Sequence, residues 1–209
     1  MAYETIAAVR PEKVRTAIFA SGAGSIAQAL IEFGLQPESR YGAVVLISNN
    51  SMCGARQIAE NFSVPFRHIS SKTHPELMMF ECAMLEIMQE FSVEIIVLSG
   101  YNKLMPAGIC SHFRGKILNI HPALLPKYGG AGMFGHVVHQ RVIENRELFS
   151  GSTVHIVDEF YDHGEIIEQS NVEIAPGETP ETLEAKIKAK EKEMYPRAVD
   201  SFAARIMKE

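Results

Sequence analysis

Residues 116–130 read KILNIHPALLPKYGG and join a short apolar segment to a polar end. The apolar residues are typical of a short buried strand over 116–120. Asn119 and His121 stand at its end, and residues two apart in an extended segment point to the same side. We therefore expect both side chains to face one point just outside a sheet.

An amide donor beside an imidazole, on a rigid strand end, suits a reaction that passes through an oxyanion. Taken alone, the motif has a second interpretation, in which Asn119 caps a turn and His121 is a half-buried histidine with satisfied hydrogen bonds. The rest of the chain decides between the two.

Strand-like and helix-like segments alternate before this stretch. The strands are expected at 14–20, 42–48, 64–69 and 93–99, and the helices at 26–33, 55–62, 75–91 and after Pro106. Such alternation predicts an α/β, Rossmann-like doubly wound sheet that is mostly parallel. Ligands bind such sheets beyond the carboxyl ends of the strands. We therefore expect residues 21–25, 100–103 and 119–121 to converge.

After this stretch the sequence predicts a glycine-rich loop, GGAGMFG, at 129–135 and a helix at 136–144. Two strands at 152–157 and 165–174, joined by 158–164, would add antiparallel strands to the sheet. A helix at 180–194 should end before Pro196, and a further helix should end at Lys208. We expect a single domain over 14–209, preceded by an extension of residues 1–13.

The first strand runs into Ser21-Gly22-Ala23-Gly24-Ser25, followed by a helix. This order places backbone N–H groups and a helix N-terminus around a phosphate. Residues 22–27 also satisfy the dinucleotide pattern G-x-G-x-x-G/A, but that site needs an acid at the end of the second strand. Asn49-Asn50 stand there instead. A simple phosphate cradle is favoured, and a purely structural tight turn is the alternative.

The composition of the chain limits which partners and which cellular compartment we expect for the protein. The formal net charge is −5, which gives no basic footprint for nucleic acid. The three cysteines, Cys53, Cys82 and Cys110, are widely spaced and predict neither a disulfide framework nor a metal site. No apolar run approaches the roughly 20 residues of a membrane span, and the start does not read as a secretory signal. We expect a cytoplasmic protein without a membrane partner.

Asn119-x-His121-Pro122, the following Leu-Leu-Pro, and Asp162 in a D-x-G context resemble the folate-dependent formyltransferases. The resemblance runs from about residue 14 to the end. The glycine loop at 21–25, the size of a lone catalytic domain and the segment from Lys190-Glu191 to Tyr195-Pro196 resemble the members that formylate glycinamide ribonucleotide in purine biosynthesis.

The resemblance implies a catalytic triad of Asn119, His121 and Asp162. Asn119 and an imidazolium of His121 would hold the oxyanion, Asp162 would raise the pKa of His121, and a water ordered by Asp162 would relay the proton. The substrate's phosphate and ribose would be bound by Gly24, Ser25, Ile26 and Glu191. The co-substrate 10-formyltetrahydrofolate would be bound by His74, Tyr101, Asn102, Lys103, Leu104, Met105, Asp158, Glu159, Phe160 and Tyr161. The family implies no metal, small-molecule substrates, and a monomer or homodimer.

Two departures from the family pattern bear on this reading. Ile26 replaces a usual asparagine, so only its backbone contact carries over, and His163 replaces a glycine where it could compete with His121 as a titrating neighbour. Formyltetrahydrofolate hydrolase is an alternative within the superfamily, whereas a methionyl-tRNA formyltransferase would need a basic surface. A nucleotide-binding module that has lost the chemistry is an alternative from another class.

Overall fold

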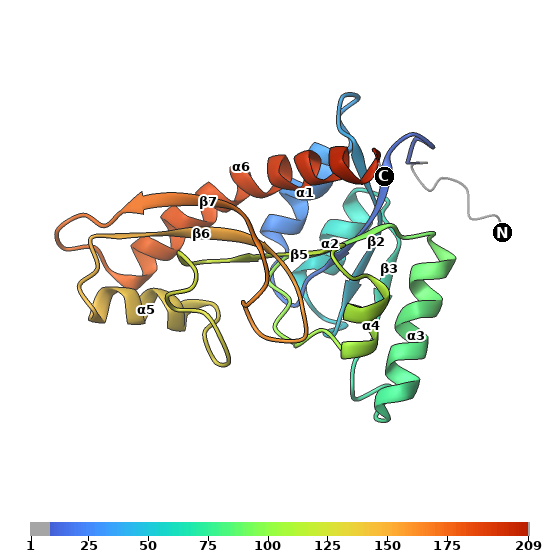
Figure 1. Ribbon diagram of the computed structural model, residues 1–209, viewed down its shortest axis with the longest axis horizontal. Helices are drawn as coiled ribbons and strands as arrows, with labels where there is room; N and C mark the ends of the chain where they lie inside the picture. The colour runs from blue at the N-terminus through green and yellow to red at the C-terminus, as the bar shows by residue number, and fades with distance from the viewer. Residues whose placement is uncertain (1–8, 209) are drawn as a thin grey trace.

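Seven strands form one mixed sheet in the computed structural model, which describes residues 9–208 (Figure 1). They are β1 (Val14–Phe19), β2 (Tyr41–Ser48), β3 (Phe66–His68), β4 (Ile95–Leu98), β5 (Ile117–His121), β6 (Phe149–Ile156) and β7 (Ile166–Glu173). Their order is β3-β2-β1-β4-β5-β6-β7. The pairs from β3 to β5 are parallel, and β6 pairs antiparallel with both β5 and β7. The predicted mostly parallel sheet with an antiparallel addition is confirmed.

The helices cover both faces of this sheet (Figure 1). They are α1 (Ser25–Gly34), α2 (Gly54–Asn61), α3 (Leu77–Glu90), α4 (Ala107–His112), α5 (His136–Glu144) and α6 (Pro180–Ile206). Side chains alternate along β1, so Ile18 packs with α1, α2 and α6, while Ala17 and Phe19 pack with α3 and α4. The apolar run at residues 17–19 of β1 therefore reflects burial on both faces.

The structure corrects one predicted helix boundary. Helix α6 continues through Pro196 instead of ending at Met194. A proline inside a helix removes one backbone hydrogen bond, and this normally favours a break. Here the residues around Pro196 are buried against the sheet, including Tyr195 and Val199, and this packing offsets the loss. Strand β6 also begins at Phe149, three residues before the predicted start at Ser152.

Part of the predicted extension of residues 1–13 joins the fold, while residues 1–8 lie outside the described part of the chain. Lys13 is buried, and its Nζ donates to the carbonyls of Gly34 (2.8 Å) and Gln36 (2.6 Å) at the end of α1. A cation at this position complements the free carbonyls and dipole of the helix C-terminus. Burial lowers the pKa of Lys13.

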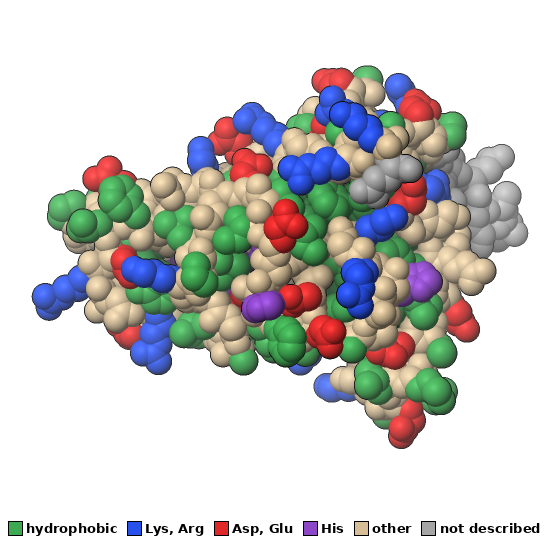
Figure 2. All heavy atoms as spheres, viewed as in Figure 1, with side chains coloured by type: hydrophobic (Ala, Val, Ile, Leu, Met, Phe, Trp, Pro, Cys, Tyr) green, Lys and Arg blue, Asp and Glu red, His purple; other side chains and the backbone are tan. Residues whose placement is uncertain are grey.

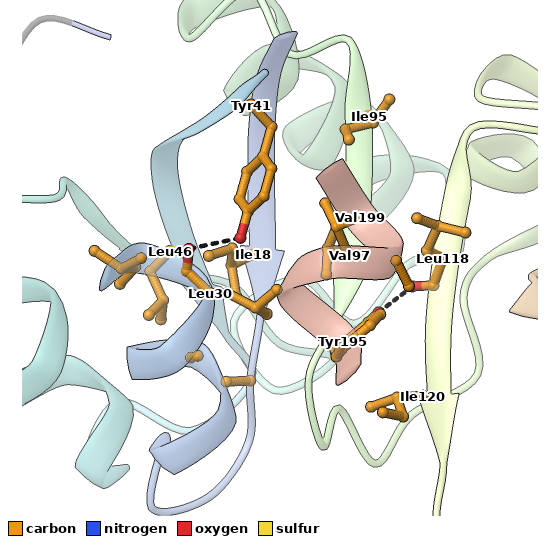
Figure 3. Close-up of a cluster of buried hydrophobic side chains, with 14 of the residues drawn as sticks. Ile18, Leu30, Tyr41, Leu46, Ile95, Val97, Leu118, Ile120, Tyr195 and Val199 are labelled. Atoms are coloured by element: carbon orange, nitrogen blue, oxygen red, sulfur yellow. Dashed lines mark hydrogen bonds between the residues drawn. The ribbon is translucent and has the colours of Figure 1, made fainter. Parts of the chain in front are cut away.

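Helix α6 is anchored over the middle of the sheet by Tyr195 (Figure 3). The single proton of its hydroxyl is shared between the carbonyls of Leu98 (3.0 Å) and Leu118 (3.1 Å), one on β4 and one on β5. The side chain is fully buried. Glu191 lies one turn earlier on the same helix and is thereby held near the carboxyl ends of these strands. None of the described helices is long and apolar enough to cross a membrane.

We expect Tyr195→Phe to lower the free energy of unfolding by about 1 kcal/mol, because a buried hydroxyl is lost along with its hydrogen bond. Urea unfolding followed by circular dichroism measures this change. Tyr161→Phe is the control, since the Tyr161 side chain is 46% exposed. A Tyr195→Phe protein as stable as the wild type would contradict the anchoring role.

Candidate active site

A cavity of about 440 Å³ lies beyond the carboxyl ends of β1, β4 and β5. It is lined by residues at or just after the end of each of these strands, in the segments 22–26, 98–105 and 119–122. The expected convergence of the three strand ends is therefore found in the structure. Residues of the glycine-rich loop, the β6–β7 connection and α6 complete the wall.

The glycine loop brings the N-terminus of α1 to this cavity. Gly24 is the N-cap, with φ +83°, and a Cβ at this position would lie 2.6 Å from the Cα of Ala55. The loop conformation and the close approach of α2 thus both require glycine. Within the described chain, α1 has no side-chain cap and no acidic residue in its first turn. An uncapped N-terminus at a cavity offers N–H groups and a positive dipole end to an anion.

Asn119 is held by a histidine that the sequence interpretation missed. In the antiparallel pairing of β5 with β6, Asn119 lies opposite His155. The Nδ1–H of His155 donates to the carbonyl of Ile156 (2.9 Å), so its Nε2 can accept from Nδ2 of Asn119 (3.1 Å). One N–H of the Asn119 amide is used in this bond, and the second remains for a ligand in the cavity.

His121 is buried, and its ring is fixed by a carbonyl. Its Nε2–H donates to the backbone oxygen of Tyr128 (2.7 Å), since a carbonyl can only accept. Its Nδ1 lies 3.4 Å from Oδ2 of Asp162. Nδ1 is thus the ring nitrogen that gains or loses a proton, and it does so beside a carboxylate.

Asp162 lies between two histidines. Its Oδ2 faces His121, its Oδ1 lies 3.5 Å from Nε2 of His155, and the backbone N–H of Gly130 donates to Oδ2 at 3.0 Å. Burial raises the pKa of Asp162, but the hydrogen bonds and charges of these neighbours outweigh that effect and lower it below its usual value. Asp162 is therefore ionised at neutral pH.

Asp162 raises the pKa of His121, as expected, but burial lowers it by more, so the net shift is downward and the expected resting imidazolium is not found. Burial lowers the pKa of His121, and the attraction of Asp162 and the hydrogen bond to Tyr128 offset only part of that shift. The resting imidazole is accordingly neutral near pH 7. The side chain is 3% exposed, so the loss of hydration is the larger effect.

His163 does not compete with His121. Its Nδ1 contacts Oδ2 of Asp158 at 2.7 Å, and its side chain is 69% exposed. The second histidine that contacts Asp162 beside His121 is His155.

Most of the residues expected to bind substrate or folate line the cavity. They are Gly24, Ser25, Ile26, Tyr101, Asn102, Lys103, Leu104, Met105, Phe160, Tyr161 and Glu191. Three others lie outside the lining: His74, Asp158 and Glu159. The Nδ1 of His74 is paired with Thr73 Oγ1 (3.0 Å), and the carboxylate of Asp158 accepts from the backbone N–H of Phe160 (2.9 Å) and contacts His163. Local hydrogen bonds therefore occupy these two side chains.

Helix α6 and helix α5 bring further charged and polar groups to the cavity that the sequence interpretation missed, among them Lys188 and His139. Lys188 lies three residues before Glu191, a spacing that puts both on one helix face and that the sequence could have revealed. His139 is 2% exposed, its Nδ1 has no partner among the described residues, and burial lowers its pKa to about 4.

Glu191 is a buried carboxyl group with one side-chain hydrogen-bond partner in the described structure, the hydroxyl of Ser152 at 3.4 Å. Burial raises its pKa to about 7. The described residues contain no group of three or more His, Cys, Asp or Glu side chains arranged to hold a metal ion.

Glu191 predicts a pH-dependent stability. The pKa of Glu191 is about 7 in the folded state, and its ordinary value is 4.5. Between these pH values the folded protein therefore binds more protons than the unfolded chain. The stabilisation by the protonated carboxyl group is complete below pH 4.5 and is lost as the pH rises through 7. Relative to wild type, Glu191→Gln should gain about 3 kcal/mol in free energy of unfolding between pH 4.5 and 7. Urea unfolding at several pH values measures this difference.

Glu193→Gln is the matched control, because Glu193 is an exposed residue of the same helix, and its difference from wild type should stay small over the same range. A Glu191→Gln difference that does not vary with pH would show that Glu191 does not titrate as described.

Solved structures and curated proteins are similar to this chain. The crystal structure of phosphoribosylglycinamide formyltransferase from Brucella melitensis matches with a TM-score of 0.85 and 34% identity, covering 92% of this chain and 96% of that one. Phosphoribosylglycinamide formyltransferase, chloroplastic, from Vigna unguiculata is 34% identical over 200 residues, which make up 96% of this chain and 64% of the plant protein. A formyltetrahydrofolate deformylase from Pseudomonas syringae shares the fold, with a TM-score of 0.82 at 21% identity, over 93% of this chain and 63% of that one.

A family model described as formyl transferase matches residues 14–199. The match extends from β1 into α6 and so includes every strand of the described residues and all residues that line the cavity. This chain belongs to the formyl transferase family.

Proposed function

We propose that this chain transfers the formyl group of 10-formyltetrahydrofolate to the amino group of glycinamide ribonucleotide, giving N-formylglycinamide ribonucleotide and tetrahydrofolate in de novo purine biosynthesis. The observation that carries the proposal is that Asn119, His121 and Asp162 share one cavity with the uncapped N-terminus of α1. Relatives that cover nearly the whole chain bear the name of this activity.

The phosphate and ribose of glycinamide ribonucleotide suit the end of the cavity formed by α1 and α6. Backbone N–H groups of Ser25 and Ile26 and the cation of Lys188 complement a phosphate dianion. The isoleucine at position 26 does not weaken this contact, because the backbone N–H can donate to the phosphate whichever side chain the residue carries. Glu191 can accept hydrogen bonds from ribose hydroxyls when ionised.

The folate suits the opposite wall, where aromatic and apolar side chains lie, including Tyr101, Leu104 and Phe160. Such surfaces bind a flat heterocycle by burial and stacking. Lys103 is exposed at this wall and complements the carboxylates of a folate glutamate tail. When bound, 10-formyltetrahydrofolate supplies the formyl group.

The three polar side chains divide the chemistry. Asn119 has one amide N–H left to donate to the oxygen on which negative charge develops. Asp162 is ionised and accepts the proton that the attacking amine loses, directly or through one water. His121, neutral at rest, can share this proton on Nδ1, which lies 3.4 Å from Oδ2 of Asp162, because the negative charge developing nearby favours the imidazolium. The same proton then passes to the leaving nitrogen of the folate as its bond to the formyl carbon breaks. Holding both substrates in one cavity supplies the proximity that the reaction needs.

We extend the proposal to the setting of the enzyme. It acts in the cytoplasm on small molecules, as a monomer or homodimer, without nucleic-acid or membrane partners and without a metal. Acidic and basic side chains are interspersed over the face seen in Figure 2, which supports small-molecule substrates over a polyanion.

An assay of purified protein with 10-formyltetrahydrofolate, with and without glycinamide ribonucleotide, separates the candidate functions. Release of tetrahydrofolate is monitored by absorbance. We expect this release only when the ribonucleotide is present. Release without it would instead identify a formyltetrahydrofolate hydrolase. No release under either condition, together with ribonucleotide binding by calorimetry, would identify a binding module.

We expect Asn119→Ala, His121→Ala and Asp162→Asn each to lower kcat by about 10² to 10³-fold, by analogy with the removal of one oxyanion donor or proton-transfer group. Steady-state kinetics at saturating substrates measures the effect, with thermal unfolding to verify folding. His112→Ala is the control, because His112 ends α4 and does not line the cavity. Full turnover by a folded His121→Ala protein would refute the assigned role.

A further inference from the structure

Asn49 directly follows β2, at the position where a dinucleotide-binding sheet would carry an acid. It does not line the cavity, and its side chain lies between two loops that do. Its Oδ1 accepts a hydrogen bond from the hydroxyl of Ser21 (2.5 Å), and its Nδ2 donates to Oδ1 of Asn102 (3.3 Å).

Two more hydrogen bonds connect the same two loops, and together the four bonds form a link between them. The hydroxyl oxygen of Ser21 accepts from the backbone N–H of Asn102 (3.1 Å), and the backbone N–H of Ser21 donates to the carbonyl of Gly100 (3.2 Å). One amide and one hydroxyl therefore join the ends of β1, β2 and β4. Four hydrogen bonds therefore connect the two loops through Asn49 and Ser21, so the loops move together unless several of these bonds break.

The two loops belong to different ligands in the proposed function. Residues 22–26 face the phosphate, and residues 100–105 face the folate. A shift of about 1 Å between reacting groups can cost a hundredfold in rate, while each loop can still bind its own ligand. A residue that fixes one loop against the other therefore affects turnover more than binding.

We propose that Asn49 is a positioning residue that holds the anion-binding loop and the folate-binding wall as one unit, and so sets the distance between the bound amine and the bound formyl group. This inference rests on the proposed function. It assigns a role to Asn49, a residue at the end of β2 that does not itself line the cavity.

Steady-state kinetics of Asn49→Ala tests the inference. We expect kcat to fall by about 10- to 100-fold, with KM for each substrate changed by less than about threefold. Asn49→Asp should recover most of kcat, because a carboxylate can accept from Ser21 and, once the amide of Asn102 turns over, also from its NH₂ group.

Asn50→Ala is the matched control. Asn50 is the neighbouring residue of the same type, but its Oδ1 accepts from the backbone N–H of Met52 (3.0 Å), and within the described chain its side chain makes no hydrogen bond to either loop. Wild-type kcat in Asn49→Ala, or an equal loss in Asn50→Ala, would overturn the positioning role. A loss of thermal stability with unchanged kcat would likewise overturn it, since that is the result of a purely structural contact.

Hydrogen exchange of the ligand-free protein gives a reading that does not depend on the reaction. Asn49→Ala should speed exchange of the Asn102 amide by about tenfold or more, because its acceptor, Ser21 Oγ, loses its own partner, whereas Asn50→Ala should not. If the wild type proves inactive as a transferase, the proposed function fails, and this exchange measurement alone decides whether Asn49 links the two loops. Unchanged exchange at Asn102 would end the inference.

Discussion

A carboxylate removed from water must find charged or polar partners, and Asp162 imposes that constraint on the centre of this molecule. Its side chain is 9% exposed and lies between His121 on β5 and His155 on β6. The backbone N–H of Gly130 completes its shell. Three segments far apart in the sequence meet around this one negative charge. The N–H of Gly130 donates to it at rest and Nδ1 of His121 can donate to it once protonated, whereas leaving it unpaired would cost several kcal/mol.

The same constraint orders the groups that face the cavity. Asp162 and Asn119 both reach His155, while Tyr128 fixes the ring of His121 from the other side. The close packing of Gly129 against Asp162, where a Cβ would lie 3.1 Å from the Cβ of Asp162, ties the start of the glycine-rich loop to the same point. The catalytic groups are thus pre-set by one hydrogen-bonded cluster, which is the arrangement that stabilises a developing charge without reorganisation.

The sequence pattern was sufficient for the sheet and for the convergence of the three strand ends, because apolar runs and glycine turns are local signals. It failed where the answer depends on neighbours across the sheet. His155 reads as one more residue of an apolar strand until its register with Asn119 is known. The net pKa direction of His121 depends on burial, which no motif displays. Helix α6 passes through Pro196 because packing against the sheet outweighs a local rule, and Asp158 and His74 are occupied by hydrogen bonds within their own turns.

The central claim is spatial: one cavity holds an anion at the N-terminus of α1 and a primary amine beside Asp162 at the same time. A crystal structure with glycinamide ribonucleotide and a non-reactive folate analogue tests it most directly. The account predicts the phosphate on the N–H groups of Ser25 and Ile26, and the amino group within hydrogen-bond distance of Asp162 or of a water held by it. A phosphate bound elsewhere, or an amine directed away from Asp162 and His121, would contradict it.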